Sequence, residues 1–184
     1  DPCRAVATAD QVVVGTPVGD IIPTLEKVLP YLQEGSLVTD VGSTKGDIVA
    51  AAESLLLKEG RELHFVGGHP LAGSEKSGPA SARADLFQDA TWAITPSSSS
   101  SDVAVSKLVQ MVQSIGAVPL ILDPETHDAI VAYTSHLPHL VSSALVNAIH
   151  AGSGHQSVTP LLAASGFRDT TRLAESSWSV WRDI

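Results

Sequence analysis

Short apolar runs alternate with stretches of helical spacing over the first part of the chain. The runs 11–16 and 36–41 are rich in β-branched residues and are followed by proline or glycine, which predicts short buried strands. The segments 20–32, 48–57 and 103–115 place apolar residues three and four positions apart, which predicts amphipathic helices. Such alternation is typical of a doubly wound α/β sheet of parallel strands. Further strands are predicted at 63–66, 91–95 and 118–122.

The pattern changes after Asp123, where the chain becomes helical in character. The run 126–150 has helical spacing, and Pro138 within it predicts a kink because proline has no backbone N–H to donate. We therefore expect two parts, a sheet-containing part over residues 1–122 and an all-helical part over residues 123–184.

The chain lacks the glycine-rich turn with which a dinucleotide-binding fold normally opens. That turn has the spacing Gly-x-Gly-x-x-Gly, with an acidic residue about 20 positions further on. Residues 14–19 (Val-Gly-Thr-Pro-Val-Gly) do not have this spacing. The sequence therefore predicts a partial Rossmann-like sheet that lacks its first βαβ unit.

Composition and charge narrow the classes of partner. The 184 residues are 43% hydrophobic and 17% charged, which is typical of a globular protein. A formal net charge of -9 argues against a nucleic acid or an acidic membrane as partner. A single cysteine excludes a disulfide framework, and no apolar run approaches the roughly 18 residues that span a bilayer. We expect a cytoplasmic protein.

Two candidate sites lie at the ends of predicted strands, where α/β sheets bind ligands. His69 opens a loop of glycines and small polar residues, 67–78, and a histidine there can exchange protons with a ligand near neutral pH. Alternatively, it hydrogen-bonds its loop neighbours. In the segment 40–46, Ser43 can bind a ligand hydroxyl and Lys45 a phosphate or carboxylate. The alternative is that the segment only caps the following helix.

The helical part carries two further clusters. His136 and His139 are three residues apart, so a helix places both on one face. Imidazoles at this spacing can bind zinc, but no Cys and no His-Glu-x-x-His arrangement accompanies them, so we predict that they bind no metal. The alternative to a ligand-binding role is that the two histidines are packed between helices and hydrogen-bonded to the backbone. Arg168 and Arg172 are four apart, and arginine can hold a carboxylate with two parallel hydrogen bonds. The alternative is a solvated face with weak ion pairs.

Taken in order, these segments resemble the prephenate/arogenate dehydrogenase family. The resemblance implies oxidative decarboxylation of prephenate to 4-hydroxyphenylpyruvate, in which a hydride leaves ring carbon C4 for NAD or NADP and the ring carboxylate leaves as carbon dioxide. Arogenate as substrate, a histidine-based metal-dependent hydrolase and a non-catalytic metabolite sensor are the alternatives. The match comprises Thr16-Pro17, 40–45, 67–73, 135–139, 166–174 and 181–184.

The resemblance also implies roles for individual residues. His69 matches the catalytic histidine, which accepts the proton of the C4 hydroxyl, and Ser43 matches the serine that orients this hydroxyl. Arg172 matches the arginine that holds a substrate carboxylate. On the same ground, the substrate pocket includes His136, His139, Ser74 and Glu75, and the cofactor is contacted by Thr16, Pro17 and Lys45.

The resemblance further implies a homodimer formed through the helical part. The glycine-rich turn of the family is absent from this sequence, and the helical domain of the family continues past 181–184. We therefore expect this polypeptide alone to bind a dinucleotide weakly and to turn over slowly or not at all. NAD and NADP are both compatible with the resemblance.

Overall fold

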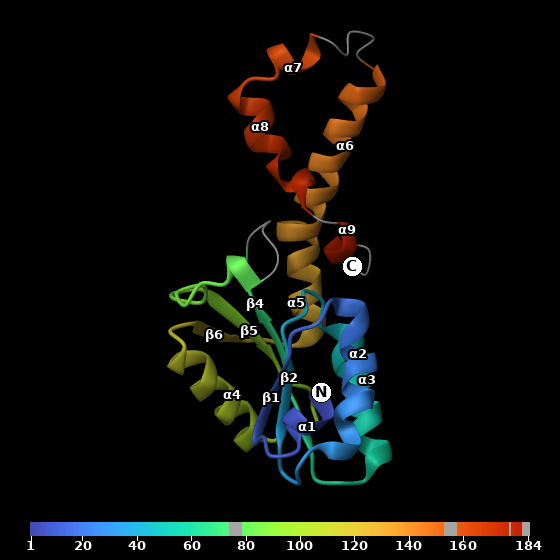
Figure 1. Ribbon diagram of the computed structural model, residues 1–184, viewed down its shortest axis with the longest axis vertical. Coiled ribbons are helices and arrows are strands. Elements are labelled where there is room, and N and C mark those ends of the chain that lie inside the picture. Colours follow the sequence, from blue (N-terminus) through green and yellow to red (C-terminus); the bar gives the residue numbers. More distant parts are fainter. Residues whose placement is uncertain (74–78, 153–157, 177, 182–184) are drawn as a thin grey trace. The chain divides into compact units, whose positions relative to one another are not determined.

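The computed structural model describes residues 1–73, 79–152, 158–176 and 178–181. The chain divides into two compact units, one from Asp1 to Asp128 and the other from Ala129 onward. The elements, which Figure 1 labels, are α1 (Pro2–Val6), β1 (Gln11–Val14), α2 (Val18–Val28), η1 (Leu29–Tyr31), β2 (Leu37–Asp40), α3 (Gly46–Glu59), β3 (His64–Phe65), β4 (Gly67–Pro70), η2 (Pro79–Ser81), β5 (Thr91–Thr95), α4 (Asp102–Ser114), β6 (Val118–Ile121), α5 (Pro124–Val131), η3 (Ala132–His136), α6 (Leu137–Gly152), α7 (Thr159–Leu162), α8 (Ser165–Thr171), η4 (Arg172–Glu175) and α9 (Trp178–Trp181).

The described strands of the first unit form two three-stranded sheets, in the orders β1-β2-β3 and β4-β5-β6. The strands β1, β2 and β3 are parallel, as the sequence predicts. A single residue, Val66, separates β3 from β4, and its N–H donates to the carbonyl oxygen of Val38 at 3.0 Å. Because β4 continues the direction of β3, the carboxyl ends of β1, β2 and β4 lie at the same edge.

Strand β5 departs from the all-parallel sheet that we expected. It runs antiparallel to β4, with Ile94 opposite Gly68 and Ala93 opposite His69, whereas β6 is parallel to β5. A parallel neighbour needs a crossover connection, usually a helix. Among the described residues between β4 and β5, the only helical turn is the short η2, so the chain returns in the opposite direction.

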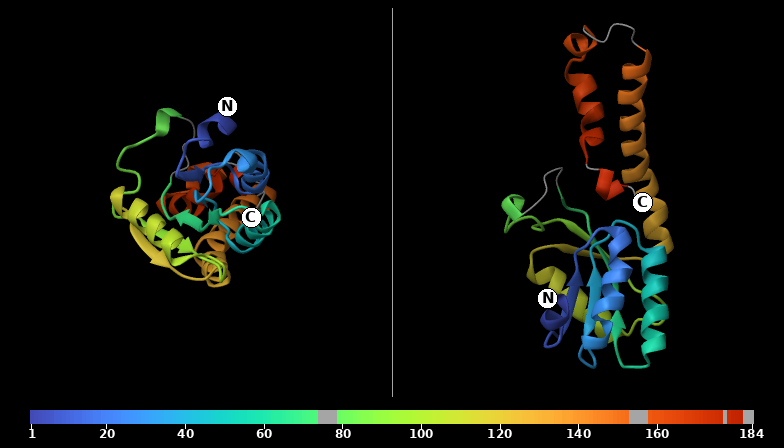
Figure 2. Two further views of the ribbon diagram at one scale, coloured as in Figure 1. Left: turned by 90° about the horizontal axis from the view of Figure 1, so that it is seen from below. Right: turned by 45° about the vertical axis from the view of Figure 1, so that its right-hand side comes forward.

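Helices cover both faces of the strands of the first unit (Figures 1 and 2). Helices α2 and α3 pack on one face, and α4 packs on the other. Successive side chains of a strand point to opposite faces, so Val38 joins the first core cluster and Leu37 joins the second. Strand β2 is therefore buried on both sides, and all four of its residues are buried, including the polar Thr39 and Asp40.

The second unit is helical. Where the sequence predicts a kink at Pro138, the structure has a π-helical turn over Ala132–His136, directly before the proline. The N–H of Leu137 donates to the carbonyl oxygen of Ala132, which widens the helix by one residue where proline interrupts the usual hydrogen bonds. Helix α8 and the following η4 lie beside α6 (Figures 1 and 2). In the described part of the chain, no helix is long and apolar enough to cross a membrane.

The close approach of β2 and β4 requires glycine at position 68. A Cβ atom at Gly68 would lie 2.6 Å from the backbone oxygen of Asp40 and 2.8 Å from Thr39 Oγ1. We predict that Gly68→Ala lowers the free energy of unfolding by about 1–3 kcal/mol, the usual cost of overpacking. Urea unfolding followed by circular dichroism measures this, with Gly15→Ala as control because no atom lies within 4 Å of a Cβ there. Equal unfolding midpoints for the two variants would contradict the prediction.

Candidate active site

The carboxyl edge of the first unit gathers several of the residues that the sequence singles out. Thr16 and Pro17 follow β1, Ser43 follows β2, and His69 lies in the last half of β4. The Thr16 hydroxyl oxygen is buried and forms no hydrogen bond with the described residues. A buried hydroxyl without a partner is costly, so a ligand with a polar group fits this position.

Lys45 lies inside the first unit, with its side chain 0% exposed. Its ammonium donates to the carboxylate of Asp40 and, at 2.9 Å, to the carbonyl oxygen of Gly68. The same carboxylate accepts the N–H of Gly42 at 2.8 Å and that of Gly68 at 3.1 Å. Burial lowers the pKa of Lys45, and the charge of Asp40 opposes this shift. The ammonium therefore faces the protein interior, where it ties β2 to β4, and not a ligand in solvent.

His69 lies at the end of a chain of three polar side chains. Its Nδ1 lies 2.8 Å from Nε2 of His127, and the two rings are nearly perpendicular at 73°. The Nδ1 of His127 lies 2.8 Å from Oδ1 of Asp128. His127 is 3% exposed, whereas His69 is half-buried. These contacts connect the carboxylate of Asp128, through the imidazole of His127, to His69 near the end of β4.

Asp128 also binds the beginning of helix α3. Its two carboxylate oxygens accept the backbone N–H groups of Lys45 and Gly46, each at 2.8 Å. No side chain of the segment 40–46 caps α3, so Asp128 supplies the cap that we considered as an alternative role for that segment. The half-buried Ser43 hydroxyl is thus not used for capping.

The sequence argument gave no role to His127 and Asp128. The available signal was the adjacent His-Asp pair shortly before the histidines of the helical part. Its partner His69 lies 58 positions away along the chain, and no spacing rule links residues at that separation. Only the fold brings them together.

In the second unit, Trp181 contacts both histidines of the helical cluster. The ring of His139 stacks on it with centroids 3.7 Å apart, and the ring of His136 meets it edge-on at 5.9 Å. Both rings thus lie on one side of the helix, as their spacing predicts. Burial lowers the pKa of His139, and the nearby backbone of Leu173 offsets part of the shift. This shift favours the uncharged form of His139.

The two arginines belong to consecutive helical elements. Arg168 belongs to α8, which ends at Thr171, and Arg172 begins the tighter η4 turn. Both are exposed, and within the described residues Arg172 forms no ion pair. Its guanidinium is open to an anionic ligand. Ser74 and Glu75, the other predicted pocket residues, lie outside the described residues.

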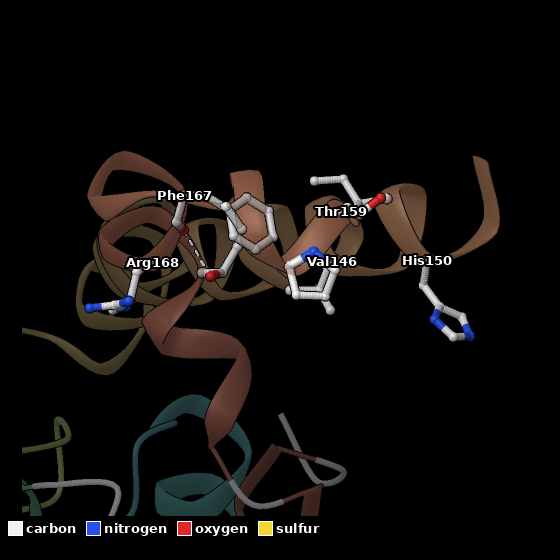
Figure 3. A pocket seen from close by; sticks show the side chains of 9 residues that line it. Val146, His150, Thr159, Phe167 and Arg168 are labelled. Carbon is white, nitrogen blue, oxygen red and sulfur yellow. Dashed lines mark hydrogen bonds between the residues drawn. The ribbon is translucent and has the colours of Figure 1, made fainter. Parts of the chain in front are cut away.

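Arg168 lines a separate pocket in the second unit, formed by α6, α7 and α8 (Figure 3). This pocket has a volume of about 360 Å³ and a mainly apolar wall, and Arg172 does not line it. The pocket is lined by Val146, Ile149, His150, Thr159, Pro160, Ala163, Phe167, Arg168 and Thr171.

Among the described residues, no group of three or more His, Cys, Asp and Glu side chains is arranged to hold a metal ion.

Comparisons with protein families match nearly the whole chain. Residues 1–121 match the family model described as prephenate dehydrogenase, nucleotide-binding domain, and residues 123–184 match prephenate dehydrogenase, dimerization domain. The chain is 38% identical over 180 residues to the prephenate dehydrogenase of Bacillus subtilis, covering 97% of this chain and 48% of that protein. It is 33% identical over 183 residues to the cyclohexadienyl dehydrogenase of Zymomonas mobilis, covering 98% and 60% respectively. The chain therefore spans about half the length of the curated relatives that it matches.

Solved structures are similar over almost all of the chain. Prephenate dehydrogenase from Aquifex aeolicus, in complex with hydroxyphenyl propionate and NAD+, superimposes with a TM-score of 0.88 and 33% identity. That match covers 98% of this chain and 62% of the other. Arogenate dehydrogenase from Synechocystis has a TM-score of 0.79 and 31% identity, covering 98% and 68% respectively.

The lowered pKa of His139 predicts a pH-dependent stability. The unfolded chain, with an ordinary histidine pKa near 6.5, binds a proton that the folded chain does not, so stability falls as pH drops below that value. His139→Phe keeps the ring on Trp181 but does not titrate. We therefore expect the melting temperature of this variant, relative to wild type, to rise between pH 7.5 and pH 5. His150→Phe, an exposed histidine of the same helix, is the control, and equal pH dependence of all three proteins would refute the prediction.

Proposed function

Because the chain belongs to the prephenate dehydrogenase family, we propose that it carries the active-site residues of an enzyme that oxidatively decarboxylates prephenate to 4-hydroxyphenylpyruvate, with NAD or NADP. The observation that carries this proposal is the gathering of Thr16, Ser43 and His69 at the carboxyl edge of one sheet unit. The named activities of its relatives in Bacillus subtilis and Zymomonas mobilis support it. Arogenate is the second candidate substrate, since a Synechocystis arogenate dehydrogenase has a similar structure.

The chemistry assigns a different task to each residue at the carboxyl edge. Ser43 orients the C4 hydroxyl of the substrate, and His69 accepts its proton while the C4–H bond breaks. Loss of the ring carboxylate as carbon dioxide supplies the electron pair that makes the ring aromatic, and His69 then returns the proton to the phenolic oxygen. When bound, the nicotinamide supplies the acceptor for the hydride. Thr16, whose buried hydroxyl lacks a partner among the described residues, and Pro17 contact the cofactor.

The residues of the helical unit bind the anionic end of the substrate in this proposal. Arg172 holds a carboxylate, which its exposed and unpaired guanidinium supports within the described residues. His136 and His139 form the pocket wall with Trp181. We also propose that Ser74 and Glu75 contact the substrate. For Lys45 we propose an indirect part in cofactor binding, through the backbone that its buried ammonium holds.

We further propose a division into a dinucleotide-binding part over residues 1–122 and a helical part over residues 123–184, which the break between the family models supports. We also propose that the protein works in the cytoplasm on a small molecule, without nucleic-acid or membrane partners. Its net charge of -9 and single cysteine support this.

The function is tested by following the absorbance of reduced nicotinamide with prephenate or arogenate, each with NAD or NADP. The assay uses the chain and any longer natural polypeptide that contains it. For the longest of these polypeptides we predict turnover with prephenate, a decrease in kcat of about 10²–10⁴-fold for His69→Asn, and an increase in KM of about 10–100-fold for Arg172→Ala. Arg168→Ala is the matched control, since it removes an exposed arginine four residues earlier and should leave KM within about twofold.

Lack of turnover with every pair of substrate and cofactor, from folded protein of the longest available form, would overturn the proposed function. Turnover with arogenate alone would change the substrate and keep the reaction type. If Arg168→Ala and Arg172→Ala changed KM equally, the carboxylate site assigned to Arg172 would be wrong.

A homodimer formed through the second unit is supported by its exposed apolar side chains. Leu161 and Leu162 are each 82% exposed, and Leu140 is 65% exposed. We predict that the double variant Leu161→Asp, Leu162→Asp is monomeric in light scattering at concentrations where the wild type is dimeric, because burying two carboxylates in an interface is unfavourable. Leu57→Asp, at a position 81% exposed in α3, is the control. A dimer that persists in the double variant would exclude this surface.

A further inference from the structure

We propose that His127 and Asp128 are positioning residues that hold His69 in one orientation and in one tautomer, with Nε2 as its proton-accepting nitrogen. The inference rests on the proposed function for its effect on turnover, but the tautomer is a property of the folded chain and is tested separately. It concerns two residues that the sequence argument left without a role.

The carboxylate of Asp128 is fixed by the beginning of helix α3. Its two oxygens accept the backbone N–H groups of Lys45 and Gly46, each at 2.8 Å, at the first turn of α3. The positive end of a helix favours a negative group there. An ionised carboxylate can only accept hydrogen bonds. The Nδ1 of His127, which lies 2.8 Å from Oδ1 of Asp128, must therefore donate to it.

The donor role of His127 Nδ1 determines the state of its other nitrogen. A neutral imidazole carries one N–H, so with Nδ1 protonated the Nε2 atom has a lone pair. The ring is 3% exposed, so solvent does not supply the partner of this nitrogen. Nε2 therefore accepts, and its partner at 2.8 Å, the Nδ1 of His69, donates. It follows that neutral His69 has its proton on Nδ1 and its lone pair on Nε2.

This state suits His69 to act as a base from Nε2. An imidazole in water favours the opposite tautomer, with the proton on Nε2, so the fold has to impose this one. When Nε2 of His69 takes the substrate proton, its Nδ1–H keeps the bond to His127. The carboxylate of Asp128 then lies behind the positive charge, as the orienting carboxylate does in catalytic triads. The pair stabilises the protonated base without contacting the substrate.

The same contacts also fix the segment that carries Ser43. One end of the segment 40–46 is tied to β4 through Asp40 and Gly68, at 3.1 Å. Its other end is tied through the N–H groups of Lys45 and Gly46 to Asp128, which follows the residue in contact with His69. Asp128 is therefore placed to set the backbone on which Ser43 lies as well as the ring of His69.

The tautomer is measured by two-bond ¹⁵N–¹H NMR of the chain with ¹⁵N-labelled histidine, with His69→Asn identifying the signal. We expect His69 to be protonated on Nδ1 in the wild type. We expect the proton to move largely to Nε2 in His127→Leu, which removes the acceptor. In His127→Gln the side-chain carbonyl oxygen can replace Nε2 as acceptor, so the wild-type tautomer should be retained. A wild-type His69 protonated on Nε2 at neutral pH would overturn the proposal.

Turnover of the longest active form provides the second readout. Asp128→Asn and His127→Leu should lower kcat by about 10²-fold or more and change KM by less than about threefold, whereas His127→Gln should recover at least about tenfold of the loss. Asp123→Asn is the matched control, because Asp123 accepts the N–H of Thr126 at 2.8 Å at the start of α5, the helix that carries His127, and so reports the effect of a weakened cap on that helix alone. It should keep both kcat and the tautomer.

The outcomes separate this proposal from the proposed function. Folded His127→Leu protein with wild-type kcat, or with a loss equal to that of Asp123→Asn, overturns the positioning role. The expected tautomers together with no turnover in any assay support the positioning role and overturn the proposed function. Urea unfolding of each variant shows that a lowered kcat comes from folded protein.

Discussion

The buried ion pair between Asp40 and Lys45 is the interaction on which the carboxyl edge of the first unit depends. Both side chains are 0% exposed, and removing two charges from water costs more than their attraction returns unless the remaining polar atoms are also satisfied. Here Gly42 and Gly68 donate to the carboxylate, and the carbonyl oxygen of Gly68 accepts from the ammonium. The pair contributes position more than stability. It fixes the strand residue next to His69 against the segment that carries Ser43.

Two different carboxylates thus organise one segment of seven residues, 40–46. Asp40 holds its beginning against β4, and Asp128 holds its end by capping α3. The close approach that this requires is possible because position 68 has no side chain. Catalytic groups must be held within fractions of an ångström, and contacts of this kind provide that precision on a strand end.

The sequence predicts the strands and helices of the first unit from their apolar patterns, but it cannot predict every direction and partner. The apolar run of β1, which is partly exposed, and that of β6, which is largely exposed, cannot be distinguished in the sequence from the buried run of β2. A buried strand has the same pattern whichever way it runs, so the antiparallel β5 could not be foreseen. Lys45 follows a strand end in a loop typical of ligand contacts, and only the fold directs its ammonium inward to Asp40. His127 gave a local signal, the neighbouring Asp128, without a means to identify His69 as its partner. The composition of the candidate site thus depends on contacts between residues that are far apart in the sequence, such as His69 and His127.

The substrate of the proposed function is an anion, and the distribution of positive charge bears on how such a substrate is bound. With a net charge of -9, the protein offers no general attraction to an anion, so binding depends on a few placed cations. Lys45 is committed to Asp40, and burial lowers the pKa of His139, which favours its uncharged form. Arg172 is exposed and has no ion pair among the described residues. In the proposed function its guanidinium binds a substrate carboxylate through paired hydrogen bonds, and this defined geometry favours selectivity over affinity.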